Sequence, residues 1–116
     1  MKTTEASAKL VPREMIQRMV DLIAAHFRPE RVILFGSYAR GEATEDSDVD
    51  LMVLLDKAPP EGKRSAPILR LLYQHFRCPV EVVVRTTAGF DEWRHTVGSL
   101  ARRVAKEGIV LYEKAE

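Results

Sequence analysis

At 116 residues, 46% of them apolar and 30% charged, the chain is long enough for one hydrophobic core and too short for two. Its formal net charge of +1 neither requires nor excludes nucleic acid. No apolar run approaches the ~20 residues of a membrane span, and the single cysteine, Cys78, excludes an internal disulfide. The N-terminus lacks the apolar segment of a signal peptide. We therefore expect a single domain over residues 1–116, with residues 1–10 flexible, in a reducing cytoplasm and away from membranes.

The first half of the chain predicts a helix followed by two strands. Apolar residues recur with helical spacing between Pro12, which suits a first helical turn, and Pro29, which ends the helix, and this predicts a helix over 12–27. Residues 32–36 form a strand that is apolar on both faces, as expected of a covered central strand. One helical turn over residues 37–40 and a polar loop lead to a second apolar strand over 49–55.

The second half predicts two further strands and more helix. A loop with two prolines and a glycine precedes a helix over 65–76, and a β-branched strand follows over 79–84. We expect helical structure over 87–106, beginning as a helix or turn and continuing as a short helix that Ser99 caps and Gly108 ends. The last strand covers 109–112. Within this region we assign Trp93 to packing, although an exposed Trp93 would suit a partner interface. The pattern predicts an α/β (α+β two-layer) fold with a mixed sheet of about four strands and helices packed against it.

A glycine–serine pair and two aspartates flank the loop between the first two strands. Ten residues separate Gly36-Ser37 from Asp48, and Asp50 follows one residue further on. Because side chains alternate along a strand, the two aspartates share one face, roughly 6.5 to 7 Å apart along the backbone. Both carboxylates could converge on one hard cation or on a pair of cations. Gly36 allows close approach of a phosphate and Ser37 adds a hydroxyl donor, whereas Asp46 is interpreted as solvated.

Glu81 is a third informative carboxylate, because it lies inside the otherwise apolar strand over 79–84. An isolated charge in such a strand is costly unless it is paired. Two arrangements would remove this cost. The strand could be an edge strand on which Glu81 faces water or an arginine, or Glu81 could share a cation with Asp48 and Asp50.

The sequences GSYARG and SDVDL, at this spacing, resemble the nucleotidyltransferase motif of the DNA polymerase β superfamily. The chain is most similar to the minimal nucleotidyltransferase (MNT) antitoxins that are paired with HEPN-domain proteins. The resemblance implies a polymerase-β-like nucleotidyltransferase core. It also implies two Mg²⁺ ions held by Asp48, Asp50 and Glu81 as catalytic carboxylates, although the third carboxylate of the family is usually an aspartate. Gly36 and Ser37 would bind the triphosphate, and Arg40 would either neutralise phosphate charge or form a structural salt bridge.

The resemblance further implies transfer of AMP from ATP to a hydroxyl, with release of pyrophosphate. We expect the acceptor to be a tyrosine of a partner HEPN toxin, which the protein would silence as an antitoxin, because the chain has no second domain to hold an acceptor. Three alternatives remain open: a non-catalytic binding module that occludes the HEPN protein, an aminoglycoside-type small-molecule nucleotidyltransferase that needs a helical partner, and a regulatory nucleotide-binding domain. A homodimer is plausible, and we do not expect direct nucleic-acid binding.

Overall fold

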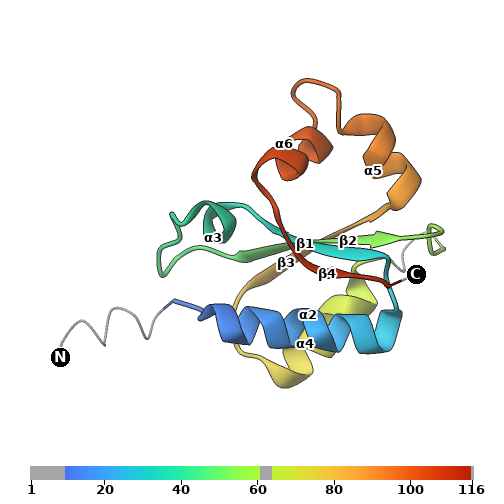
Figure 1. The fold of residues 1–116 in the computed structure, drawn as a ribbon. Coiled ribbons are helices and arrows are strands. Elements are labelled where there is room, and N and C mark those ends of the chain that lie inside the picture. Colours follow the sequence, from blue (N-terminus) through green and yellow to red (C-terminus); the bar gives the residue numbers. More distant parts are fainter. Residues whose placement is uncertain (1–9, 61–63, 116) are drawn as a thin grey trace.

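The computed structural model describes residues 10–60 and 64–115, so most of the segment predicted to be a frayed start, residues 1–10, lies outside the described residues (Figure 1). The element bounds along the chain are α2 Arg13–Phe27, β1 Arg31–Phe35, α3 Ser37–Arg40, β2 Val49–Leu55, α4 Ala66–His75, β3 Val80–Thr86, α5 Thr87–Trp93, α6 Leu100–Glu107 and β4 Ile109–Glu113. Each predicted strand is present within two residues of its expected ends. Within the described ranges, no helix combines the length and apolar character needed to cross a bilayer.

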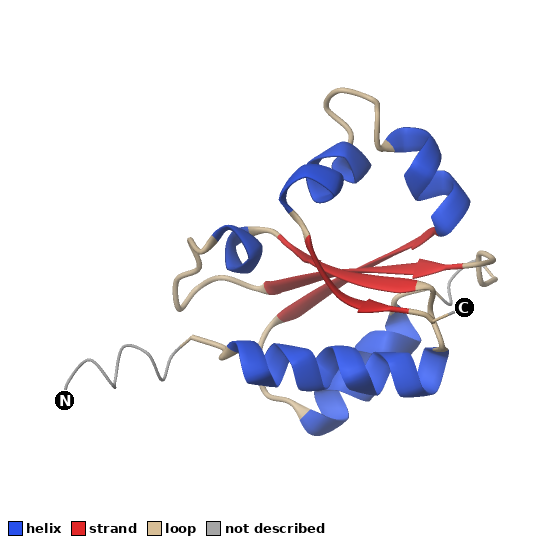
Figure 2. Cartoon of the chain, viewed as in Figure 1, coloured by secondary structure: helices blue, strands red, loops and turns tan. Residues whose placement is uncertain are grey.

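The four strands form one mixed sheet in the order β3-β2-β1-β4. Figure 2 shows this sheet, in red, between helices above and below it. β1 pairs antiparallel with both β2 and β4, and β2 pairs parallel with β3. This order places β1 and β2 in the middle and leaves β3 at an edge. The predicted mixed sheet of about four strands is therefore confirmed, and its edge carries the strand that contains Glu81.

Helices lie on both faces of the sheet (Figure 1). On one face, α2 and α4 pack against a core that includes Val32 and Leu34 of β1. On the other face, Ile33 and Phe35 form a smaller cluster with residues of α5 and α6. The sheet with α2 and α4 supplies the two layers that were predicted, and α5 and α6 add a third, partial layer. The reason is the composition of β1, which is apolar on both sides and must be covered on both.

The helical region predicted over 87–106 is interrupted between α5 and α6. α5 ends at Trp93, and Gly98, in the segment between the two helices, has a φ of +88°, in the left-handed region that favours glycine. Ser99 then adopts an extended conformation, and its hydroxyl accepts a hydrogen bond from the Arg102 amide at 3.0 Å, so the predicted cap of the short helix is confirmed. The packing role predicted for Trp93 is wrong, because this side chain is 55% exposed at the end of α5.

Candidate active site

The pairing of β1 with β2 brings the two halves of the glycine–serine and aspartate motif together. Asp50 on β2 lies opposite Phe35, the last residue of β1, and Gly36 follows directly. Gly36 has φ +76° and ψ −157°, a conformation that is essentially restricted to glycine. A Cβ at this position would overlap Oδ2 of Asp50 and would lie 3.1 Å from its Cγ. Glycine is therefore the residue that lets this turn lie against the carboxylate.

Glu81 lies beside Asp50 on the neighbouring strand. The parallel register of β2 and β3 pairs Asp50 directly with Glu81. Alternation along the strands places both side chains on the sheet face that carries α5 and α6, the same face as Met52 and Val83. Glu81 is exposed on an edge strand, as the first of the two arrangements requires. Its position beside Asp50 is compatible with the second, and a cation shared by these carboxylates stays a prediction.

The electrostatic environment of Asp50 disfavours its charge. Burial is the largest cause, followed by the charge of Glu81 and a side-chain hydrogen bond with it, and then by the charge of Asp48; together they raise the pKa of Asp50 to about 6. The positive charge of Arg40 acts in the opposite direction but does not cancel the shift. The carboxylates of Asp48, Asp50 and Glu81 therefore lie close together, and the positive charge of Arg40 does not neutralise their repulsion.

Such a set fits a divalent cation chemically, because carboxylate oxygens are the ligands that Mg²⁺ prefers and a cation would relieve their repulsion. Asp50 and Glu81 supply two adjacent ligands. Asp48 immediately precedes β2, is exposed, and is close enough for its charge to raise the pKa of Asp50. Over residues 10–60 and 64–115, however, no three Asp, Glu, His or Cys side chains are gathered closely enough to hold a metal ion. The structure thus joins Asp50 to Glu81 and leaves Asp48 at the margin of the pair.

Arg40 makes the structural salt bridge that the sequence analysis left open. Its Nε lies 3.0 Å from Oε1 of Glu42, and its Nη1 lies 3.1 Å from Oε1 of Glu107. Both partners raise the pKa of the Arg40 guanidinium. Since Glu107 ends α6, this contact ties the turn after Gly36 to the helix layer above the sheet. Exposed ion pairs of this kind are weak, so a phosphate group could still compete for Arg40.

Hydrogen bonds fix the two segments that flank the site, α3 and the loop before Asp48. The Tyr38 hydroxyl of α3 accepts a hydrogen bond from the Val11 amide at 3.0 Å. In the loop before Asp48, the Ser47 hydroxyl accepts from the Thr44 amide at 2.9 Å, and the Ser47 amide donates to the Thr44 carbonyl at 3.0 Å. The sequence analysis noted Ser47 only as part of the SDVDL motif and did not single out Thr44, although serine and threonine three residues apart in a polar loop are typical of such turns.

The sequence profile of the nucleotidyltransferase domain matches residues 13–111. The chain belongs to this family. A protein of Methanocaldococcus jannaschii, named provisionally as a protein adenylyltransferase, is 42% identical over 102 residues, which cover 84% of this chain and 94% of the relative. The protein adenylyltransferase MntA of Thermococcus cleftensis is 37% identical over 51 residues, or 38% of this chain and 52% of MntA. In two other M. jannaschii relatives, the matched segment spans 45% and 30% of the relative's length.

The fold is also found in solved structures. A toxin–antitoxin crystal structure with AMP-PNP superposes with a TM-score of 0.64 at 21% identity, covering 84% of this chain and 73% of the other. This likeness shows that the two chains share a fold. The predicted family, the fold class and the assignment to the nucleotidyltransferases are therefore confirmed, whereas the roles of individual residues remain predictions.

We predict that Gly36→Ala destabilises the protein more than Gly41→Ala. Both glycines have a positive φ, +76° and +74°, but nothing lies within 4 Å of a Cβ at Gly41. Gly41→Ala should therefore cost only the backbone strain, about 1 kcal/mol. Gly36→Ala should cost about 1–3 kcal/mol and must also displace Asp50. Urea denaturation measures the difference, and equal losses in the two variants would contradict the contact with Asp50.

We predict that Asp50→Asn stabilises the metal-free protein at pH 7.5. A raised pKa means that the folded state disfavours the charged carboxylate, so the penalty is present above pH ~6 and disappears as the pH falls towards ~4, where the group is neutral in both states. The gain should be on the order of 1 kcal/mol after allowance for solvent screening.

Denaturation in EDTA between pH 4.5 and 7.5 measures this gain. Asp56→Asn, which removes an exposed carboxylate just beyond the other end of β2, is the control and should show no comparable gain. If the gain from Asp50→Asn grew as the pH fell, the direction of the Asp50 pKa shift would be wrong.

Proposed function

We propose that this protein is a Mg²⁺-dependent nucleotidyltransferase that transfers AMP from ATP to a hydroxyl group of a partner protein. The observation that carries the proposal is the convergence of Gly36, Asp50 and Glu81 at one end of the sheet. In the proposed site, Asp50 and Glu81 hold the metal with help from Asp48. Gly36 and Ser37 bind the triphosphate, and Arg40 exchanges a carboxylate partner for phosphate.

The chemistry requires an in-line attack at the α-phosphorus of ATP. A bond forms between the acceptor oxygen and this phosphorus, the bond to the bridging oxygen of the β-phosphate breaks, and pyrophosphate leaves. When bound, two Mg²⁺ ions would supply stabilisation of the attacking and leaving oxygens. Among the protein's own groups, the Glu81 carboxylate is exposed and can accept the proton of the acceptor hydroxyl. Within the part of the chain that the structure describes, the Ser37 hydroxyl forms no hydrogen bond, so it can donate to a phosphate oxygen.

The relatives support a protein as the acceptor. One relative is named a protein adenylyltransferase, and structural neighbours come from toxin–antitoxin pairs, among them a variant of MntA–HpeT. We infer that the acceptor here is a tyrosine of a HEPN-domain toxin and that its modification silences the toxin. The second candidate is neutralisation by binding alone. Trp93 at the end of α5 is 55% exposed, and an exposed tryptophan is typical of surfaces that dock another protein.

Intact-mass analysis of a candidate HEPN partner tests the proposal. After incubation with this protein, ATP and Mg²⁺, we expect the partner mass to rise by whole AMP units. The double variant Asp48→Asn/Asp50→Asn should abolish the gain, because it removes the charges that hold the metal. Asp46→Asn changes an exposed acid of the preceding loop and is the matched control, which should retain transfer.

Three outcomes separate the candidates. Loss of transfer in the double variant alone supports catalysis by the carboxylates. Full transfer by the double variant refutes their assignment. The binding candidate is favoured if the wild type and the double variant form equally stable complexes that neutralise the partner equally well, without any mass gain.

A further inference from the structure

A second site lies away from the carboxylates, in a cavity of about 490 Å³ between β3 and the α5–α6 layer. Its floor and walls include Arg64, Arg85, Thr86, Phe90, Trp93 and Leu100. Arg85 lies four residues beyond Glu81 on β3 and therefore points to the same face of the sheet, roughly 13 Å further along the strand. The cavity thus opens on the active-site face but at the opposite end of β3.

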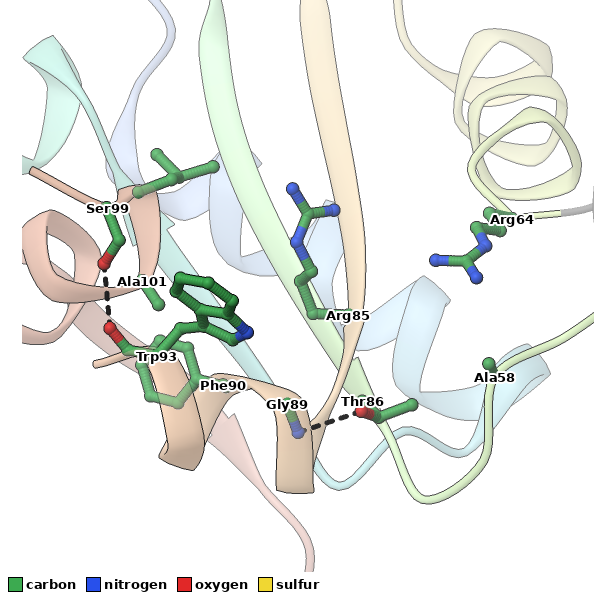
Figure 3. A pocket seen from close by; sticks show the side chains of 10 residues that line it. Ala58, Arg64, Arg85, Thr86, Gly89, Phe90, Trp93, Ser99 and Ala101 are labelled. Carbon is green, nitrogen blue, oxygen red and sulfur yellow. Dashed lines mark hydrogen bonds between the residues drawn. The ribbon is translucent and has the colours of Figure 1, made fainter. Parts of the chain in front are cut away.

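The described residues that line the cavity supply hydrogen-bond donors from Arg64, Arg85 and Thr86 and include no acidic side chain. Arg64 and Arg85 have no ion-pair partner within residues 10–60 and 64–115; Arg85 donates from one nitrogen to the Val84 carbonyl at 3.0 Å and keeps its other N–H groups. The Thr86 oxygen accepts from the Gly89 amide at 3.0 Å, which leaves its hydroxyl proton available. Figure 3 shows Arg85 rising from β3 with Trp93 on one side and Arg64 on the other. Two guanidinium groups that face one cavity and have no counterion among the described residues favour binding of an anion.

An aromatic wall stands beside these donors. Trp93 is 55% exposed, while Phe90, which also lines the cavity, is buried at 2%. The Ser99 hydroxyl donates to the Trp93 carbonyl at 2.8 Å, so the end of α5 is tied to the start of α6 and the wall is held in place (Figure 3). An exposed, positioned indole offers a face on which a planar ring can stack.

We propose that this cavity binds a nucleoside monophosphate, with the base stacked on Trp93 and the phosphate held by Arg64 and Arg85. The cavity volume lies within the range of about 300–1,000 Å³ that is typical of small-molecule sites. The indole of Trp93 could stack on a nucleobase, and the guanidinium groups of Arg64 and Arg85 could bind the phosphate of the same molecule. This site goes beyond the proposed function and does not depend on it, because it uses none of the carboxylates assigned to transfer.

NMR titration of the whole chain with AMP in EDTA tests the site directly. Trp93 is the single tryptophan of the sequence, so its indole N–H gives a resonance that needs no further assignment. We expect this resonance to shift saturably with AMP. Arg85→Gln should weaken binding by about tenfold, as expected for the loss of a charged hydrogen bond. Arg70→Gln, an exposed arginine of α4 outside the residues that line the cavity, is the matched control and should bind as the wild type does.

The same titration in Asp48→Asn/Asp50→Asn separates the two sites. Unchanged AMP binding in this variant supports an independent cavity site and says nothing against transfer by the carboxylates. Loss of the indole shift in this variant would place the nucleotide at the carboxylates and overturn the proposal. Equal affinity in Arg85→Gln and wild type, no saturable shift with AMP, or a shift with an acidic peptide but not with AMP would also overturn it.

Discussion

The last residue of β1 and the start of β2 lie at the same end of the sheet. There the backbone of Gly36 lies against the carboxylate of Asp50 and leaves no room for a Cβ. This contact depends on the antiparallel register that sets Phe35 opposite Asp50, and it fixes where a phosphate at the Gly36 turn would lie relative to the carboxylate. The parallel pairing of β2 with β3 then adds Glu81 beside Asp50. Backbone pairing of β1, β2 and β3 therefore brings Gly36, Asp50 and Glu81 together.

The site is electrostatically unfavourable in the metal-free protein. The pKa of Asp50 rises to about 6 because burial and the neighbouring charges of Glu81 and Asp48 disfavour its ionised form. Arg40 is near enough to oppose this shift, but its guanidinium is held by Glu42 and Glu107. Strained or charged groups that lower stability are common where function requires them. A cation at this point would turn the same repulsion into binding energy.

The sequence predicted the strands well because each is a short, apolar or β-branched segment with clear boundaries. It also predicted the motif, since the spacing between Gly36 and Asp50 is local information. The residue pattern alone left two arrangements open for Glu81, and only the family resemblance placed it near Asp50. Strand order is decided by packing between segments far apart in the chain, so the pattern could not choose between them. The start of α6 was predicted correctly, because a serine cap is a local signal. The exposure of Trp93 was not, since the tertiary structure decides whether a side chain at the end of a helix is covered.

The most direct test of the account is to locate the metal in crystals grown with Mn²⁺ and a non-hydrolysable ATP analogue. Mn²⁺ replaces Mg²⁺ at oxygen sites and can be identified by its anomalous scattering. The account predicts Mn²⁺ bound to Asp50 and Glu81, with the triphosphate against Gly36 and Ser37. Mn²⁺ and triphosphate bound elsewhere, with Asp50 and Glu81 contacting neither, would contradict it.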